Sequence, residues 1–345
     1  MIIDIFNHFM PKAYLDRLAG LIPGHVAVTA LPRLKTLWDV DARLALLDEF
    51  DGLQQVLSLA NPPLELIAPP DQTPELARLA NDALAELCHR HPDRFPAFIA
   101  ALPMNNVEAS LAEIDRAVTS LGARGIQVFT NVAGKPLSAP EFRPIFARMA
   151  AHDLPVWVHP MRGPNFADYA SEQASENEIW FSFGWPYETT ACMTRLIYSR
   201  IFDELPGLKI VSHHMGGMIP YFSGKINLGF RQIFFGTSER NPAAEEAGLK
   251  RRPIDYFKML YADTALGGEL APTRCGHAFF GTARTLFATD APFDAEQGRA
   301  LIRDTIRAVE ALEISKAEQA RIFEGNARAL LRLPAAAERK TGTLA

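Results

Sequence analysis

The chain has 345 residues and a net charge of −5 at pH 7, and 48% of its residues are hydrophobic while 22% are charged. These values are typical of a globular protein with a sizeable core, and the mild charge without a basic stripe argues against a nucleic-acid-binding protein. Three cysteines, Cys88, Cys192 and Cys275, lie far apart without a CxxC pair, which argues against a disulfide framework or a thiolate zinc site.

The first residues, MIIDIFNHF, contain no cationic segment followed by an apolar one, so no signal peptide is predicted. No run approaches the roughly 18 apolar residues that a membrane span needs. Together with the cysteine usage, which fits a reducing compartment, these features predict a cytoplasmic protein.

Short apolar segments alternate with segments of helical periodicity along the chain. Strands are predicted at residues 1–6, 52–60, 95–102, 125–130, 155–159, 208–212, 259–265 and 285–289. Helices are predicted at residues 40–50, 74–91, 107–121, 139–152, 188–205, 218–235, 296–312 and 315–331. Residues 161–186 are predicted to form a long loop, and residues 241–252 a charged surface insertion.

This alternation predicts a (β/α)8 barrel with an insertion after the first strand and a C-terminal helical extension. An open, doubly wound sheet is the alternative, but it usually carries a GxGxxG turn after its first strand, and none is present here. No repeat or linker divides the sequence. Residues 1–335 are therefore predicted to form one domain, followed by a disordered tail at 336–345.

Polar residues follow several of the predicted strands, at the carboxyl-terminal end of the barrel, which we call the mouth. His8 follows the first strand, His159 the fifth, His213 and His214 the sixth, and Asp290 the eighth. Each position alone also fits a structural role; Asp290, for example, could close a turn. Imidazoles and a carboxylate that converge from different strands favour a divalent metal site.

A set of motifs, specific only when taken together, runs from Ile2 to about Leu333. They are IDIFNHFMP at the start, HPDRF at 91–95, GARGIQVFTN at 122–131, LPVWVHP at 154–160, WPYETT at 185–190, LPGLKIVSHHMGGMIPYF at 205–222, ATDAPF at 288–293 and IFEGNARAL at 322–330. With these motifs the chain resembles the amidohydrolase superfamily, in the branch of aminocarboxymuconate-semialdehyde decarboxylase and related aromatic-acid decarboxylases.

The resemblance implies a (β/α)8 barrel, metal ligands at His159 and Asp290, and a catalytic histidine at His214. Because successive strand residues point to opposite faces, His213 is then expected to face away from the mouth and to have a packing role.

The chain departs from the family at its first strand. The family usually begins with HxH or ExH, which supplies two metal ligands, but here these positions are Phe6 and His8. Phenylalanine has no lone pair, so His8, His159 and Asp290 remain as ligands of one divalent ion, which could be zinc, manganese or iron. Three protein ligands and a water still make a workable catalytic site, although a weak or absent metal site is the alternative.

The resemblance implies a metal-dependent carbon–carbon lyase, a decarboxylase, that acts on a small aromatic or unsaturated carboxylic acid. His214 would act as a general acid or base, and Asp290 would bind the metal and deliver a proton to carbon. Arg162 is a candidate partner for the substrate carboxylate and Trp185 a candidate wall for a flat substrate. A solvated loop arginine and an aromatic residue at a subunit interface are the structural alternatives.

Other functions remain open at this point. The same residues could support a metal-dependent hydrolase of an ester, lactone or amide, or a non-haem iron oxygenase, or a partner subunit whose metal site has decayed at Phe6. The expected partners are a small-molecule substrate and a second copy of the chain in a homodimer, with no nucleic acid and no membrane.

Overall fold

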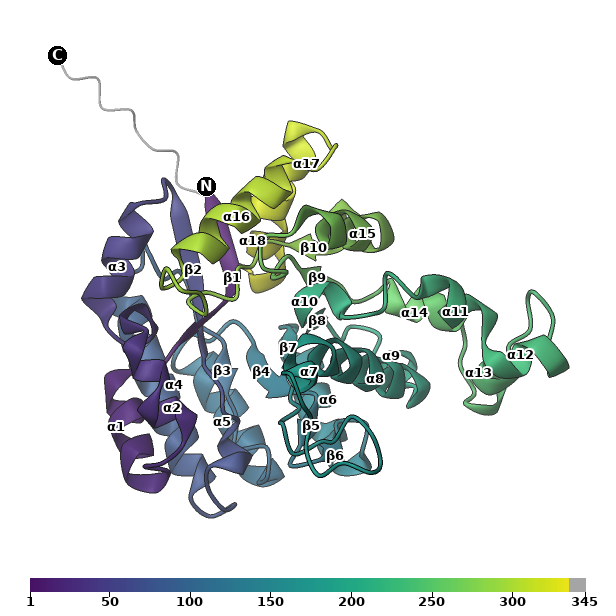
Figure 1. The fold of residues 1–345 in the computed structure, drawn as a ribbon, viewed down its shortest axis with the longest axis horizontal. Coiled ribbons are helices and arrows are strands. Elements are labelled where there is room, and N and C mark those ends of the chain that lie inside the picture. Colours follow the sequence, from purple (N-terminus) through teal and green to yellow (C-terminus); the bar gives the residue numbers. More distant parts are fainter. Residues whose placement is uncertain (335–345) are drawn as a thin grey trace.

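The computed structural model describes residues 1–334, so the predicted tail at 336–345 lies outside the described residues. Eight short parallel strands form the centre of the molecule, and helices surround them (Figure 1). These strands are β1 (Ile2–Phe9), β2 (Leu53–Leu59), β3 (Ala100–Ala101), β4 (Ile126–Phe129), β7 (Val156–His159), β8 (Ile210–Ser212), β9 (Tyr261–Asp263) and β10 (Thr285–Leu286). Each falls within or next to a predicted strand segment. The fold is the mixed α/β barrel that the alternation predicts.

Backbone hydrogen bonds close the barrel. Six strands form one sheet in the order β10-β9-β8-β7-β4-β3, and β1 pairs with β2. A bridge between Leu57 and Phe98 joins β2 to the segment before β3. On the other side, the amide of Ile5 donates to the carbonyl of Phe287 at 3.0 Å, and the amide of His8 donates to the carbonyl of Ala291 at 2.8 Å. The strand ends therefore meet at one mouth.

Most of the helices cover the outside of the barrel. Those of the insertion after β1 are α1 (Lys12–Leu21), α2 (Val26–Thr29) and α3 (Val40–Asp48). Those between the later strands are α4 (Thr73–Arg90), α5 (Val107–Thr119), α6 (Arg143–His152), α7 (Ile179–Ser182), α8 (Gly184–Tyr198), α9 (Ile201–Glu204), α10 (His213–Gly216), α11 (Ser223–Leu228), α12 (Phe230–Phe235), α13 (Pro242–Glu246), α14 (Pro253–Phe257) and α15 (Leu270–Phe280). The C-terminal extension contains α16 (Arg299–Glu310), α17 (Lys316–Ala320) and α18 (Asn326–Leu331).

Short turns and a small hairpin complete the described elements. They are the 3-10 turns η1 (Leu31–Arg33), η2 (Lys35–Leu37), η3 (Leu64–Leu66), η4 (Pro140–Phe142) and η5 (Thr282–Arg284), the π-turn η6 (Arg321–Gly325), and the hairpin of β5 (Asn131–Val132) and β6 (Lys135–Pro136). The predicted helix at 218–235 is two short helices, because Gly229 between α11 and α12 has a φ of 57°. The long loop predicted at 161–186 contains α7 and the first turn of α8.

Side chains alternate between the barrel interior and the layer under the helices, as strand geometry requires. Trp157 and Val211 belong to the interior cluster, whereas their neighbours Val156 and Ile210 pack in the outer layer. In β1 the register shifts between Asp4 and Asn7. This irregularity brings Phe6 into the interior cluster directly after Ile5 and so changes which residues of β1 face the mouth.

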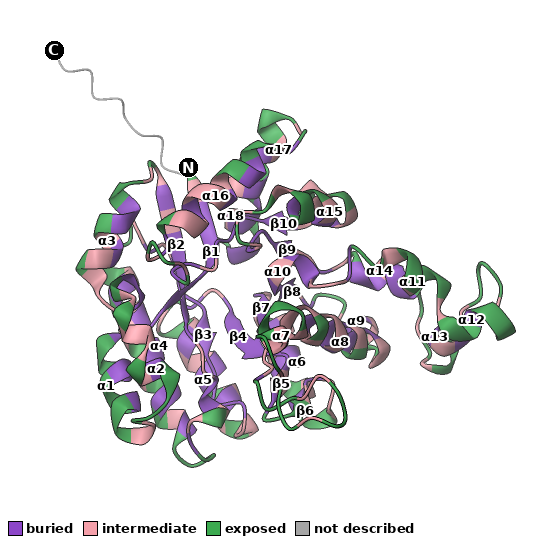
Figure 2. Cartoon of the chain, viewed as in Figure 1, coloured by how far each residue is buried: buried purple, intermediate pink, exposed green. Residues whose placement is uncertain are grey.

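The segment from α11 to α14 extends away from the barrel as an arm (Figure 1). The barrel strands are buried, whereas α12 at the end of this arm is largely exposed (Figure 2). Within residues 1–334, the structure contains no helix that is both long and apolar enough to cross a membrane.

Candidate active site

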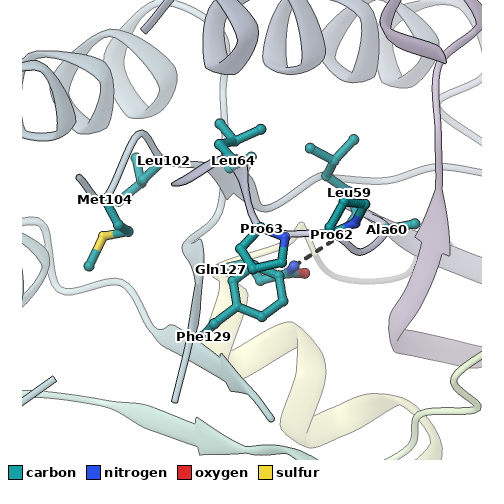
Figure 3. Close-up of a pocket in the computed structure, with 10 residues that line it drawn as sticks. Leu59, Ala60, Pro62, Pro63, Leu64, Leu102, Met104, Gln127 and Phe129 are labelled. Atoms are coloured by element: carbon teal, nitrogen blue, oxygen red, sulfur yellow. Dashed lines mark hydrogen bonds between the residues drawn. The ribbon is translucent and has the colours of Figure 1, made fainter. Parts of the chain in front are cut away.

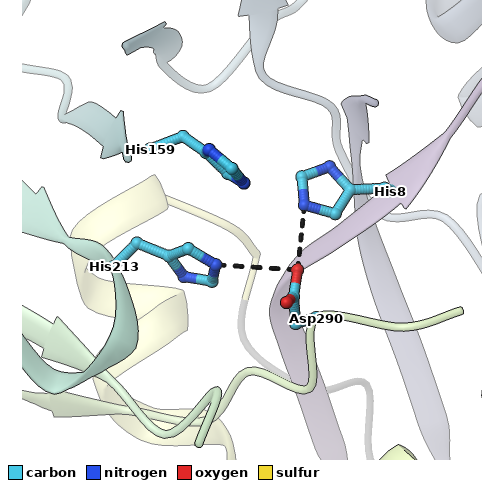
Figure 4. A group of neighbouring side chains, drawn as sticks. All are labelled: His8, His159, His213 and Asp290. Carbon is cyan, nitrogen blue, oxygen red and sulfur yellow. Dashed lines mark ion pairs between the residues drawn. The ribbon is translucent and has the colours of Figure 1, made fainter. Parts of the chain in front are cut away.

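Four polar side chains meet inside the mouth of the barrel. His8, His159, His213 and Asp290 each offer one ligand atom, and these atoms all lie within 4.8 Å of one another (Figure 4). They come from β1, β7, the end of β8 and the segment after β10. The predicted convergence of His8, His159 and Asp290 is therefore present in the structure.

The prediction that His213 faces away from the mouth is wrong. Its ring is fully buried, and its Nε2 lies 3.6 Å from Oδ1 of Asp290. Val211 points into the barrel interior, and His213 follows two positions later on the same face. The sequence carries no signal for this orientation, because Ile210 and Val211 are both apolar and either could face the interior.

His214 also reaches the site, because the chain turns sharply after His213. The backbone of His214 is left-handed, with φ 54° and ψ 50°, so strand alternation no longer applies. Its Nε2 lies 3.5 Å from Oδ2 of Asp290. Gly217 completes the turn where a Cβ would collide with the carbonyl of Pro186 on α8. Both histidines therefore contact Asp290, one through each carboxylate oxygen.

Hydrogen bonds fix the ring orientation of the three clustered histidines. Nδ1 of His159 donates to the carbonyl of Pro160 at 2.7 Å, and Nδ1 of His213 donates to Oδ2 of Asp263 at 2.8 Å. Nδ1 of His8 lies 3.3 Å from Oγ of Ser58. In each ring, Nε2 is therefore the nitrogen whose lone pair could bind a metal ion.

The pKa values of the clustered side chains depend on the charges of their neighbours in the cluster. Burial alone lowers the pKa of His213, but the carboxylates of Asp263 and Asp290 outweigh it and raise this pKa to about 9. Burial and the neighbouring histidines hold the pKa of His159 well below its usual range. The pKa of Asp290 is also well below its usual range, because contacts with the surrounding histidines outweigh its burial. Asp290 is therefore an anion and His159 a neutral imidazole at neutral pH.

A buried polar network under the site was not predicted from the sequence. Arg43 of α3 is fully buried and donates to the carbonyl of His8 at 2.6 Å and to Gln55 at 2.7 Å. Asp4 accepts hydrogen bonds from the amide and hydroxyl of Thr289, the residue before Asp290. Burial raises the pKa of Asp4 to about 6, although hydrogen bonds from Thr289 and Gln55 oppose the shift. The network links β1 to the segment that carries Asp290. The sequence feature that could have indicated it is Asp4, a carboxylate within an otherwise apolar strand.

A cavity of about 640 Å³ opens above the cluster, a size suited to a small ligand. Its residues are mostly apolar and include His159, His214 and Asp290 at the base. Trp185 lies 5.2 Å from His159 between ring centroids, and its ring is near-parallel to that of His214, at 27°. Among the described residues that line this cavity, none is a lysine or arginine. The lining therefore suits a flat apolar molecule whose charged group lies at the base.

The two predicted substrate-binding residues lie differently. Trp185 lines the cavity. Arg162 does not appear among the described lining residues, because its guanidinium forms an ion pair with Glu188 at 3.0 Å and lies over the ring of Phe166. In this structure Arg162 is therefore held by Glu188 and Phe166, neither solvated as in the structural alternative nor directed at the cavity.

A second hollow lies nearby, between the ends of β2 and β4. It is lined by Leu59, Pro62, Leu64, Met104 and Phe129, and Gln127 donates to the carbonyl of Leu59 across its floor (Figure 3). Its volume of about 10 Å³ is close to the minimum for a single water. This hollow is therefore too small to hold an aromatic acid.

The cluster fits a divalent metal ion. In the described part of the chain, Nε2 of His8 and Oδ1 of Asp290 are buried without a hydrogen-bond partner, although they lie 3.0 Å apart as an ion pair. Imidazole nitrogen and carboxylate oxygen are ligands that zinc, iron and manganese accept. His8, His159 and Asp290 are therefore able to hold one such ion at the base of the cavity.

Comparisons with known proteins agree with this geometry. The amidohydrolase family profile matches residues 37–333. The chain is 33% identical to gamma-resorcylate decarboxylase of Rhodococcus jostii (strain RHA1) over 344 residues, covering 96% of this chain and 98% of the relative. It is 29% identical to 2-amino-3-carboxymuconate-6-semialdehyde decarboxylase of Dictyostelium discoideum, covering 74% of this chain and 67% of the relative.

A solved structure shows the same fold. It is 5-carboxyvanillate decarboxylase of Novosphingobium aromaticivorans with bound manganese and a nitrobenzoic acid, with a TM-score of 0.81 and 26% identity over 96% of this chain and 97% of that one. Its barrel matches the architecture described here and its manganese is consistent with a divalent metal in this cluster. The chain belongs to the amidohydrolase family and is an enzyme of the group that contains the aromatic-acid decarboxylases.

Proposed function

We propose that the protein is a metal-dependent decarboxylase that releases carbon dioxide from a small aromatic carboxylic acid. The observation that carries this proposal is the His/Asp cluster at the base of a largely apolar cavity. The kinship to decarboxylases of gamma-resorcylate and 5-carboxyvanillate supports it, because the names of both relatives specify aromatic acids.

The cavity orients such a substrate in one way. The rings of Trp185 and Phe181, whose centroids are 4.8 Å apart, offer an aromatic wall to a flat ring. With no cationic side chain among the described lining residues, the carboxylate and any adjacent ring oxygen belong at the base, beside the cluster. A divalent ion held there by His8, His159 and Asp290 would bind and polarise these oxygens.

We propose that His214 and Asp290 transfer a proton to the ring carbon that loses carbon dioxide. Cleavage of the carbon–carbon bond leaves the electron pair on the ring carbon, which must then accept a proton. His214 lines the cavity and lies 3.5 Å from Asp290, so this pair can take a proton from solvent and donate it to that carbon. Burial and the neighbouring His213 lower the pKa of His214, which makes its protonated form a stronger acid.

The test is the product. Protein loaded with zinc, manganese or iron should release one carbon dioxide per molecule of aromatic acid consumed, with gamma-resorcylate and 5-carboxyvanillate as the first probes. Aliphatic acids of similar charge should react far more slowly, because they cannot use the aromatic wall. Water-dependent cleavage of an ester or lactone without carbon dioxide would instead indicate a hydrolase, and oxygen uptake an oxygenase.

We further propose that two copies of the chain assemble through the arm. This segment exposes a group of large apolar side chains, and such patches mark protein interfaces. The group consists of Leu228, Phe230, Ile233, Phe234 and Phe235, and Tyr221 and Phe222, directly before α11, are also exposed.

Light scattering should therefore give twice the mass of one chain, and Phe230→Ser with Phe234→Ser should give the monomer. Tyr169→Ser, at an exposed aromatic residue outside the arm, should leave the mass unchanged. A native protein of monomer mass would contradict this assembly.

The single-domain organisation of residues 1–335 and the cytoplasmic location stay proposals. Hydrogen bonds between neighbouring strands around the barrel, from β1 to β10, support the single-domain organisation. Three free cysteines, Cys88, Cys192 and Cys275, are consistent with a reducing compartment and so support the second.

A further inference from the structure

The ring of Phe6 occupies the place in β1 where the family carries a metal ligand. It is fully buried, and its centroid lies 4.3 Å from that of His213, 5.1 Å from that of His8 and 5.9 Å from that of His159. Phe6 and His8 therefore both lie at the cluster, despite the irregularity in β1. A benzene ring offers no lone pair, so β1 contributes one ligand instead of two.

His213 has the features that a ligand needs. Its Nδ1 donates to Oδ2 of the fully buried Asp263 at 2.8 Å, which fixes the ring and directs Nε2 into the cluster (Figure 4). Among the described residues, none forms a hydrogen bond with this Nε2. Ligating histidines commonly donate their other nitrogen to a carboxylate in this way.

The neighbouring His214 has a different position. It approaches Oδ2 of Asp290, whereas His8 and His213 both approach Oδ1. Its side chain is 18% exposed and lines the cavity, while that of His213 is fully buried beneath it. The site therefore has two sides. The inner side, at Oδ1 of Asp290, contains His8 and His213, and the outer side, at Oδ2, contains His214 and faces the cavity.

We propose that His213 is a direct metal ligand that replaces the ligand lost from β1 at Phe6, so that the ion is held by His8, His159, His213 and Asp290. This inference rests on the metal site of the proposed function but not on the reaction. Asp263 acts as a positioning residue: it holds the ring of His213 and also accepts from the amide of His214 at 3.1 Å.

The first experiment counts ligands in the native protein. X-ray absorption spectroscopy of the full-length chain loaded with zinc should show three imidazole ligands. Two imidazoles, or failure to bind zinc at all, would overturn the proposal. This measurement needs no substitution and therefore does not depend on whether a variant folds.

The second experiment measures zinc affinity by competition with a chelating dye. His213→Gln should weaken binding by at least about 100-fold, and Asp263→Asn by about 10–100-fold, as for other residues that orient a ligand. His214→Asn is the matched control and should change the affinity by less than about 3-fold, since its ring lies outside the inner side of the site. Equal losses in the His213 and His214 variants would overturn the assignment.

A reciprocal exchange tests the replacement itself. Phe6→His should recover most of the lost zinc affinity in the His213→Gln chain, because it returns the ligand to β1. In the native chain the same substitution should change affinity by less than about 3-fold, since His213 already completes the set. Equal gains in both backgrounds would show that the two positions act independently and would contradict the proposal. All of these readouts are independent of carbon dioxide release, so a failure of the proposed reaction would remain distinguishable.

Discussion

Asp290→Asn should lower the metal content of the loaded protein from about one ion per chain to less than about a tenth of that, and decarboxylation should be lost with it. Asp290 is the only carboxylate among the four described side chains of the cluster, and its Oδ1 lies 3.0 Å from Nε2 of His8. An amide oxygen keeps the shape of the side chain but removes the charge that attracts a divalent cation.

The substitution is also conservative for the backbone. Asp290 has a φ of 62°, and asparagine is among the residues that tolerate this conformation best. Elemental analysis after loading with zinc, manganese or iron gives the metal content, and thermal unfolding checks the fold. Glu313→Gln, at a carboxylate that is 88% exposed, is the control and should retain the metal. A full equivalent of metal in the Asp290 variant would show that the carboxylate is not a ligand.

His214→Asn should reduce the rate of carbon dioxide release by about 10²–10⁴-fold, the usual contribution of a general acid or base. His214 lines the cavity beside Asp290 and is the group placed to protonate the ring carbon. Its left-handed backbone again suits asparagine, so the turn after β8 should be preserved.

Steady-state kinetics on metal-loaded protein measure this loss, and it should appear in kcat with metal content and melting temperature nearly unchanged. His89→Asn, on the exposed side of α4, provides the control and should leave kcat as it is. If the His214 variant lost its metal together with its activity, His214 would belong to the metal site instead. An unchanged kcat would remove it from the reaction.

Most of the fold was predictable because it depends on local patterns. Apolar segments such as PVWVH and helical periodicity in segments such as α4 recur in alternation, and that alternation has few stable architectures. Element boundaries were less predictable. Gly229 divides one predicted helix into α11 and α12, and aromatic residues in the predicted loop after β7 form α7 and the start of α8.

The site was predictable only where strand geometry alone places a residue. His159 is the last residue of β7, so its position at the mouth follows from the strand itself. Arg162 comes three residues later, in a loop, and its partner Glu188 lies 26 positions away on α8. No local pattern specifies such a pairing, so the sequence could not show that Glu188 holds the Arg162 guanidinium.

The sequence by itself determined the alternation that builds the barrel and the three polar residues His8, His159 and Asp290 that reach its mouth. The tertiary structure decided the roles of the two adjacent histidines after β8. Strand alternation allowed only one of them at the site, but the left-handed turn at His214 brings both to Asp290. A turn of this kind depends on long-range contacts, such as the hydrogen bond from the amide of His214 to Asp263 on β9, which sequence periodicity does not encode.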